Sequence, residues 1–484
     1  MILNRKSRFI LILALFCFSM VWAQKPKEIT INGNAPFAAN YEIRIINYSD
    51  YITFTPLVVA STKIDANGKF QLSYKASGVQ LTKIEINTSS SELFLVPGYQ
   101  YNFDLNMDKE LFSLFNPLDE NAYIEIKPNP LDTNDLNFKI QKFSYLYEAI
   151  LQNHIKNIIN NKTYNYFDSL QLEVSQYFPI EYNPTNFYLS FIYYTLGQIE
   201  VIVNTKNQKK TFEKYFNNDY ILYDNPAYMS LFNYYFDNYL YLSPKISKTV
   251  LDDAINIKCD YLTLFNEIGK DYSLVNERLR ELVIIKNLSQ FIGNQDFDQL
   301  NVVRLLQYII KNTKFAEHKK IAENALNKVT KFEPGIKVDK FDFKYANGAK
   351  FNPNDLKGKW VFYQFFTTQC VDCIKEMLII EELQKAYKDD IVFVSVSVDA
   401  DPTKFIQFKK KYKQFDWEFV HFNNNYMWLK QMEIYSLPEY LLFSPDGTLY
   451  MRYPPALDKS LPILLMQLFQ KEEKEKNPLE VGRD

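Results

Sequence analysis

Two cysteines three positions apart, Cys370 and Cys373, are the feature that most restricts how this chain can fold. They follow an apolar, strand-like run from Trp360 to Phe366 and open a helix-like stretch from Ile374 to Tyr387. At positions i and i+3 of a helix start, the two thiols lie on one face, close enough to form a disulfide. The unpaired backbone N–H groups of that helix start stabilise a thiolate on the first sulfur. A C-x-x-C pair between a strand and a helix therefore predicts a redox pair.

The length and the charge set outer limits on fold and partners. A chain of 484 residues is too long for one ordinary core, so two to four domains are expected. A formal net charge of −2 gives no indication of nucleic acid or of an anionic membrane surface as a partner.

Residues 1–23 have the pattern of a secretory signal. A basic region (Arg5, Lys6, Arg8) precedes an apolar run from Phe9 to Val21. Val21-Trp22-Ala23 then places small residues at the −3 and −1 positions of a cleavage site. An uncleaved membrane anchor is the alternative, but the run is short for a bilayer span. We therefore expect an exported, periplasmic protein, with or without attachment at the membrane, and no stable membrane span after cleavage.

Residues 24–130 are expected to form a β-sandwich. Tyr41, Ile43 and Ile45 alternate with polar residues, which is the period of a half-buried strand. Asn67-Gly68 and Pro97-Gly98 stand between such runs as turn signals. Several short strands separated by turns are typical of a sandwich.

Residues 131–332 are expected to be all helical, because apolar residues such as Ile140, Phe143 and Tyr147 recur at spacings of three and four. The many Tyr and Phe residues predict packed core, with a peptide-binding groove as the alternative. Cys259 shares a predicted helical stripe with Ile255 and Leu262, which indicates a buried structural cysteine.

Residues 336–475 are expected to form a three-layer α/β/α sandwich with a mixed sheet, followed by a charged tail at 476–484. Strand signals at 391–398 and 440–443 alternate with helix signals at 402–412 and 461–469. The predicted fold class of the chain is therefore multidomain α+β.

The run around the cysteines resembles the exported TlpA/ResA-type thioredoxins. That family reads L-K-G-K, an apolar strand and F-W-A-T-W-C-x-x-C-x-x-E-M-P, and here the run is Leu356-Lys-Gly-Lys-Trp-Val-Phe-Tyr-Gln-Phe-Phe-Thr-Thr-Gln-Cys370-Val-Asp-Cys373-Ile-Lys-Glu376-Met. Residues 24–130 resemble, by pattern alone, the N-terminal β-sandwich that often precedes such modules in Bacteroidetes-type bacteria. The likeness implies a thioredoxin-like fold over 336–475.

The resemblance also implies site residues. Cys370 would be the nucleophile and Cys373 the resolving cysteine of a redox disulfide. Ile434-Tyr-Ser-Leu437-Pro438 resembles the family's segment that ends in a cis-proline, so Leu437 and cis-Pro438 would bind substrate.

Some residues depart from the family pattern or modulate the site. Gln369 replaces a tryptophan, and Gln364 stands where thioredoxin-like proteins often have a buried acid. Asp372 lies between the cysteines, where its charge would oppose a thiolate. Glu376 matches the family's helix acid and is expected either to modulate the cysteines or to be an exposed first-turn residue.

The predicted function is a reductase-like, periplasmic thiol–disulfide oxidoreductase that acts on protein disulfides, with a membrane electron donor as an implied partner and no cofactor. A non-enzymatic binding or scaffold protein is the alternative, favoured by the departures at Gln369 and Gln364. A thiol peroxidase is third, because Thr367 lies three residues before Cys370. A zinc site is not expected, since the scattered His154, His318 and His421 would have to join the pair.

Overall fold

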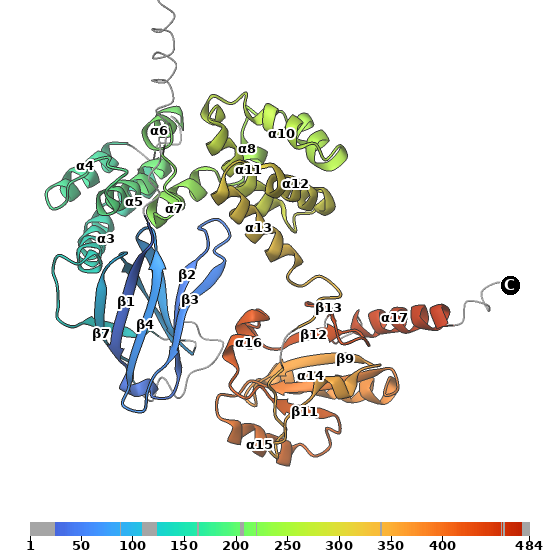
Figure 1. The fold of residues 1–484 in the computed structure, drawn as a ribbon. Coiled ribbons are helices and arrows are strands. Elements are labelled where there is room, and N and C mark those ends of the chain that lie inside the picture. Colours follow the sequence, from blue (N-terminus) through green and yellow to red (C-terminus); the bar gives the residue numbers. More distant parts are fainter. Residues whose placement is uncertain are drawn as a thin grey trace, which may run out of the picture.

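The computed structural model describes residues 25–87, 89–108, 123–161, 164–203, 208–218, 220–338, 341–455, 457 and 460–476. The predicted signal segment 1–23 lies outside these residues, as do residues 477–484 of the predicted tail. Figure 1 shows three groups of elements in chain order: strands at the lower left, helices above them, and a second sheet with helices at the lower right. The chain is therefore a multidomain α+β protein.

The first group consists of strands: β1 (Lys27–Asn34), β2 (Glu42–Tyr48), β3 (Pro56–Lys63), β4 (Lys69–Ala76), β5 (Gln80–Ile86), β6 (Ser89–Leu95), β7 (Gln100–Asn106) and β8 (Glu125–Pro128). They form two four-stranded sheets in the orders β4-β1-β7-β8 and β3-β2-β5-β6. In β4, Phe70 and Leu72 are buried and Lys69 and Gln71 are exposed, which is the alternation of a half-buried strand. Apolar side chains of both sheets belong to one core.

The second group consists of helices: α3 (Leu136–Asn161), α4 (Tyr164–Ser175), α5 (Phe187–Val203), α6 (Gln208–Tyr215), α7 (Pro226–Tyr235), α8 (Tyr239–Leu242), α9 (Lys248–Asp252), α10 (Tyr261–Ile268), α11 (Glu277–Phe291), α12 (Gln299–Asn312) and α13 (Ala316–Thr330). One core lies among α3, α4 and α5, and a larger one extends from α5 to α13. Tyr51, between β2 and β3, belongs to the larger core and so connects the helices to the first group.

Cys259 does not lie on the continuous helical stripe that the sequence predicts. A π-helical turn, Asp253–Ile257, ends before it, and α10 begins after Asp260. The break has a local cause, since the Asp260 side chain caps α10 by accepting the backbone N–H groups of its first turn. Cys259 takes a positive φ of 53° and is half-buried, whereas Leu262 on α10 is 57% exposed. The prediction of a shared stripe is wrong.

The third group contains β9 (Trp360–Phe366), α14 (Val371–Ala386), β10 (Ile391–Ser397), α15 (Pro402–Lys411), β11 (Glu418–His421), α16 (Tyr426–Gln431), β12 (Glu439–Phe443), β13 (Leu449–Met451) and α17 (Ser460–Lys476). The sheet order is β11-β10-β9-β12-β13. β10 runs parallel to β9 and β11, whereas β12 runs antiparallel to β9 and β13. The central strand β9 is buried along its whole length, which explains why its sequence is apolar and aromatic at every position except Gln364.

Alternate residues of β9 belong to cores on opposite faces of this sheet. Val361, Tyr363 and Phe365 pack with α16, and Trp360 and Phe362 pack with α14 and α17. Helices therefore cover both faces, as the predicted three layers require.

One helix of the third group, α16, is absent from the sequence-based prediction. The Asn425 side chain caps it by accepting the backbone N–H of Trp428. The helix has only six residues, so hydrophobic periodicity carries little information about it.

Residues 341–351 form a hairpin, as the apolar run 341–345 and the turn pair Asn347-Gly348 predict. The backbone N–H of Tyr345 donates to the carbonyl of Ala349, and that of Phe351 donates to the carbonyl of Phe343, each at 2.9 Å. Gly348 takes a φ of 83° in the turn.

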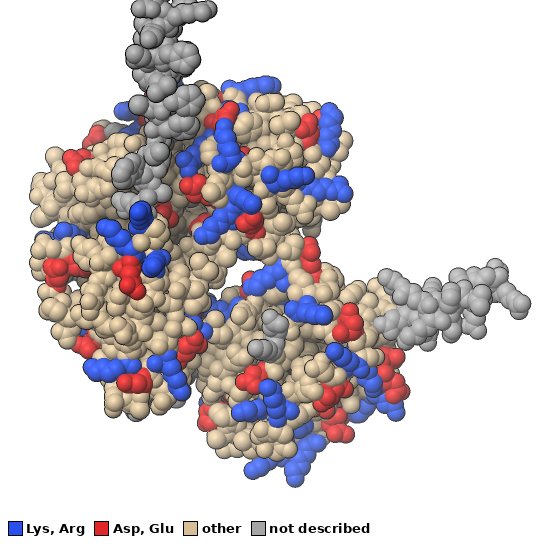
Figure 2. Space-filling view, viewed as in Figure 1, with Lys and Arg blue, Asp and Glu red and all other residues tan. Residues whose placement is uncertain are grey.

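Ion pairs connect the third group to the other two. Lys430 on α16 pairs with the buried Glu85 on β5, and Lys331, just after α13, pairs with Glu433 at 2.9 Å. Figure 2 shows Lys and Arg intermixed with Asp and Glu on the visible face, in keeping with the small net charge. None of the helices in the described ranges is both long enough and apolar enough to cross a bilayer.

Candidate active site

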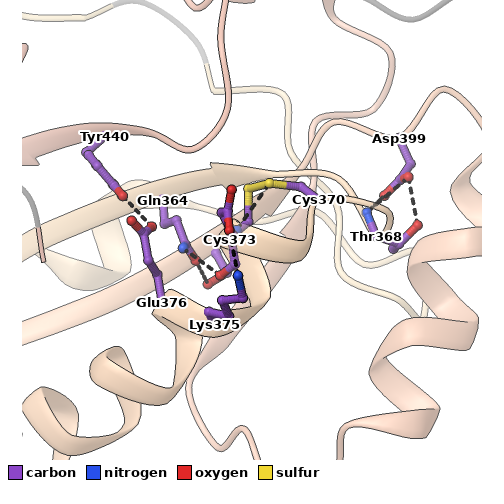
Figure 3. The surroundings of a disulfide bond; sticks show 10 residues. Gln364, Thr368, Cys370, Cys373, Lys375, Glu376, Asp399 and Tyr440 are labelled. Atoms are coloured by element: carbon purple, nitrogen blue, oxygen red, sulfur yellow. Dashed lines mark hydrogen bonds and ion pairs between the residues drawn. A yellow bond between two sulfur atoms is a disulfide. The ribbon is translucent and has the colours of Figure 1, made fainter.

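The junction between β9 and α14 carries the two cysteines. Cys370 is the N-cap of α14, and its Sγ accepts the backbone N–H of Cys373 at 3.2 Å. The two sulfurs form a disulfide with an S–S distance of 2.06 Å (Figure 3). Cys370 is half-buried, whereas Cys373 has no exposed surface. A reaction partner from solution therefore meets Cys370 first.

Gln364 lies fully buried on β9 and contacts the start of α14. Its Nε2 donates to the carbonyl oxygen of Cys373 at 3.2 Å, and its Oε1 accepts from the Ser395 hydroxyl, also at 3.2 Å. The indole N–H of Trp417 donates to the same hydroxyl at 2.9 Å. An amide does not titrate, so this hydrogen-bonded chain fixes the position of Cys373 without offering a site for its proton.

Glu376 supplies a carboxylate one turn after Cys373. It is half-buried, and the hydroxyl of Tyr440 on β12 donates to it (Figure 3). Burial raises the pKa of Glu376, and hydrogen bonds from Tyr440 and Gln364 oppose that rise. Glu376 is therefore not an exposed first-turn residue, because its carboxylate is within hydrogen-bonding reach of the buried Gln364 amide.

Asp372 and Lys375 form an ion pair at 3.0 Å, with side-chain exposures of 77% and 70%. Exposed pairs of this kind contribute only about 0–1 kcal/mol, because water screens them. Lys375 offsets part of the repulsion that Asp372 exerts on a thiolate.

The loop between α16 and β12 contains Leu437 and Pro438, and the peptide bond between them is cis. Leu437 packs against the apolar cluster that includes Cys373, and Cys370 packs against the same cluster. The disulfide and this loop therefore share one surface. Val371 and Tyr435, with 64% and 51% of their surface exposed, add apolar area from α14 and from the loop.

Arg452 holds this loop in place, a role that the sequence analysis did not predict. It is 3% exposed and follows β13. Its Nε donates to the carbonyl of Met432 at 2.6 Å, its Nη2 to that of Glu433 at 2.7 Å, and its Nη1 to the Glu439 carboxylate at 3.2 Å. A charged residue at the end of a strand is usually exposed to solvent, so the sequence contains no local signal that Arg452 is buried against this loop.

Asp399 fixes the turn that leads into α14, and it too was missed. Its carboxylate is 6% exposed and accepts the backbone N–H of Thr368 at 3.0 Å, the Thr368 hydroxyl at 2.9 Å and the Ser397 hydroxyl at 2.7 Å (Figure 3). A usable signal existed, since Asp399 lies two residues after the end of β10 and parallel neighbours end at the same sheet edge. That edge is where the strand before Cys370 ends.

His421 on β11 contacts the same edge of the sheet through the backbone of Asp399. Its Nε2 donates to the carbonyl of Asp399 at 2.7 Å, and its Nδ1 accepts the backbone N–H of Asn423 at 3.0 Å. Nδ1 can accept only while the imidazole is neutral. Burial also favours the neutral form and lowers the pKa of His421, although Asp399 and Asp401 act in the opposite direction.

We expect the third group to lose stability as pH falls below about 6.5, the ordinary pKa of histidine. Since the folded pKa of His421 is depressed, the unfolded state binds the extra proton, and acid favours unfolding. Each pKa unit by which folding lowers the pKa of His421 corresponds to about 1.4 kcal/mol of unfolding free energy.

Urea unfolding followed by tryptophan fluorescence measures this free energy, because the described tryptophans, Trp360, Trp417 and Trp428, all lie in the third group. Replacing His421 with glutamine should flatten the dependence; an unchanged wild-type free energy of unfolding between about pH 7.5 and 5.5 would contradict the assignment.

Within the described residues, no three or more His, Cys, Asp or Glu side chains gather so that they could hold a metal ion.

A sheet flanked by helices, with a disulfide at the N-terminus of the helix after its central strand, defines the class of thioredoxin-fold thiol–disulfide oxidoreductases. Residues 358–449 match the family model described as thioredoxin-like. The thiol–disulfide oxidoreductase ResA of Bacillus cereus is 34% identical over 122 residues, which are 25% of this chain and 69% of that protein. ResA of Bacillus subtilis is 28% identical over 153 residues, or 31% of this chain and 76% of that protein.

A solved structure of a candidate thiol–disulfide oxidoreductase from Bacteroides vulgatus is also similar, with 25% identity, 28% of this chain and 98% of that chain covered, and a TM-score of 0.27. The chain belongs to the ResA-like family of thioredoxin-fold proteins, and it is an oxidoreductase. The resemblance seen in the sequence around the cysteines is confirmed.

Proposed function

We propose that this protein is an exported, periplasmic, reductase-like oxidoreductase that exchanges disulfides with protein substrates through Cys370 and Cys373. The observation that carries the proposal is the asymmetry of the pair. Cys370 is half-exposed at a helix N-cap with a backbone N–H directed at its sulfur, and Cys373 is fully buried behind it. The first sulfur is placed to attack a partner, and the second to complete the exchange.

The exchange proceeds in two balanced steps. The Cys370 thiolate attacks one sulfur of the substrate disulfide, a mixed disulfide forms, and the other substrate sulfur leaves as a thiolate that takes up a proton. Cys373 then loses its proton and attacks Cys370 Sγ, which breaks the mixed disulfide and releases the second substrate thiol. Two electrons have passed from the dithiol to the substrate, and the Cys370–Cys373 disulfide is the oxidised product.

Glu376 takes part in proton movement at the site. A free thiol is only a few per cent ionised at neutral pH, so the second step needs a group that helps Cys373 lose its proton. Gln364 occupies the place of a buried acid and cannot accept it, but it donates to the carbonyl of Cys373 and to the Glu376 carboxylate. Burial raises the pKa of Glu376, which makes its carboxylate a better proton acceptor.

Protein substrates are proposed to bind along the loop that contains Leu437 and cis-Pro438. The backbone groups of Leu437 are proposed to pair with an extended substrate segment. The exposed apolar surface of Val371 and Tyr435 extends the contact area. Asp372, at the exposed side of Cys370, is proposed to disfavour acidic segments.

We propose that the chain is divided into a β-sandwich at 24–130, a helical region at 131–332 and the thioredoxin-like domain at 336–475. Separate apolar cores in the three groups support this division. Turnover in an oxidising compartment requires electrons from elsewhere, so a membrane protein with an exposed dithiol is the proposed donor.

The midpoint potential of the Cys370–Cys373 pair is expected to lie nearer that of thioredoxin, about −270 mV, than that of the oxidant DsbA, about −120 mV. No histidine or proline stands between the cysteines to favour the reduced form strongly. Equilibration with dithiothreitol buffers of known potential, followed by alkylation and mass measurement, gives this value. A midpoint above about −170 mV would rule out the reductase-like assignment.

A further inference from the structure

A cavity of about 840 Å³ lies between the first and second groups, far along the chain from the cysteines. Strands β6, β7 and β8 form one side, and helices α3 and α5 with the start of α7 form the other. In Figure 1, α3 lies above β7. The volume is within the range of small-molecule binding sites, about 300–1,000 Å³.

Aromatic rings make up much of the wall. Phe94, Tyr101 and Phe103 line it from the strands, and Phe138 and Phe191 line it from the helices. Such rings provide apolar contact area, and their faces attract cations.

The two sides of the cavity are tied together before any ligand binds. The Asn137 amide on α3 donates to the carbonyl of Phe94 at 2.8 Å and accepts the Phe94 N–H at 2.6 Å. The ring of Phe94 also meets that of Phe191 edge to face, with centroids 5.7 Å apart. A site fixed in this way loses little conformational entropy when a ligand enters.

The ionisable residues that line the cavity are acidic. Glu92, Asp132 and Asp135 line it, and no Lys, Arg or His occurs among the described residues that do. Asp132 and Asp135 also accept the backbone N–H groups of Asn134, just before α3, and Asn137, in its first turn, each at 2.8 Å. Lys83 pairs with Glu92 at 3.9 Å and offsets its charge, and the N-terminus of a helix carries only about half a positive charge, so Asp132 and Asp135 leave the cavity electronegative.

We propose that this cavity is a binding site for an organic cation with an aromatic or apolar body. The ammonium or guanidinium group would lie near the carboxylates, and the body would pack among the rings. The amides and hydroxyls on the same wall, such as Gln141 and Thr195, offer further hydrogen bonds. The ligand chemistry could come from a free amine or from a basic and aromatic peptide segment. This site is independent of disulfide exchange.

Three small molecules that share a phenylpropyl group but differ in charge test the proposal. Their binding to the whole oxidised protein is measured by calorimetry. 3-Phenylpropylamine should bind saturably and at least about tenfold more tightly than 3-phenylpropanol, whereas 3-phenylpropionate should not bind. A blocked Lys-Phe dipeptide forms the second arm: displacement of the amine by this dipeptide assigns the site to peptide segments, and its failure to compete assigns the site to free amines.

Two kinds of variant place the binding in the cavity. Glu92→Gln, Asp132→Asn and Asp135→Asn together remove the charge, while the asparagines can still cap α3. This triple variant should weaken the amine about tenfold or more and leave the alcohol unchanged. Glu148→Gln, an exposed residue on α3 that does not line the cavity, is the matched control and should bind like the wild type.

The second variant, Ser144→Phe, reduces the cavity without changing its charge and should weaken the amine and the alcohol alike. Equal affinity for the three probes, tighter binding of the carboxylate, or no saturable binding of the amine at millimolar concentration would overturn the proposal. Unchanged amine affinity in both variants would do the same, because it would place the binding elsewhere.

Discussion

Replacing Cys370 with serine is expected to lower the reduction of insulin disulfides to the uncatalysed background, because the half-exposed sulfur that attacks the substrate is gone. Replacing Cys373 with serine is expected to stop turnover as well, for a different reason. Attack by Cys370 still occurs, but no second thiol is present to release the substrate. Turbidity of insulin with dithiothreitol as the electron source measures both effects.

The matched control is Cys259→Ser. Cys259 is half-buried between the π-helical turn and α10, and burial raises the pKa of its thiol, so it is a poor nucleophile. This variant should keep wild-type activity. Insulin reduction that survives both active-site substitutions would leave the non-enzymatic scaffold hypothesis as the better account. Consumption of hydrogen peroxide faster than insulin reduction would instead favour the peroxidase.

Replacing Arg452 with methionine is expected to have the largest effect on stability. The guanidinium is 3% exposed, and its loss leaves the carbonyls of Met432 and Glu433 and the carboxylate of Glu439 without their donor. Breaking a buried charged pair of this kind costs about 3–5 kcal/mol. Urea unfolding followed by tryptophan fluorescence measures the decrease in the free energy of unfolding, because the described tryptophans all lie in the third group.

Arg452 should also affect catalysis in a way that separates positioning from general damage. Its partners lie at both ends of the loop that contains Leu437 and cis-Pro438, so the variant should raise KM for insulin at temperatures where it remains folded. The midpoint potential should stay at the wild-type value, because Cys370 and Cys373 keep their own contacts. Arg304→Met, an exposed residue on α12, is the control and should change neither quantity. An unaltered KM for a folded Arg452→Met protein would argue against the positioning role.

The C-terminal third of the chain could be predicted well from sequence because its signals are local. A strand that is apolar except at Gln364, a C-x-x-C pair and the helix after it lie within about thirty residues, and each segment carries its own secondary-structure signal. The Asn67-Gly68 turn is similar: Gly68 takes a φ of 83°, as a turn of that kind requires. Such features depend on neighbouring residues alone.

The missed features depend on contacts between distant residues. Asp399 meets Thr368 across 31 positions, and Arg452 meets Met432 across 20. The burial of Glu376 follows from β12, whose Tyr440 lies 64 positions away. Residue spacing cannot reveal such contacts, because they arise only when the sheet brings the elements together. The cavity between α3 and β7 has the same origin, since its walls come from separate groups of elements.

The most direct measurement of the central claim is the mass of the Cys373→Ser protein after it meets an oxidised peptide disulfide. Reversible exchange at Cys370 predicts one covalent adduct per chain, mapped to the peptide that contains Cys370 and released by dithiothreitol. No adduct, or an adduct on Cys259 alone, would contradict the claim that this half-buried sulfur exchanges bonds with substrates.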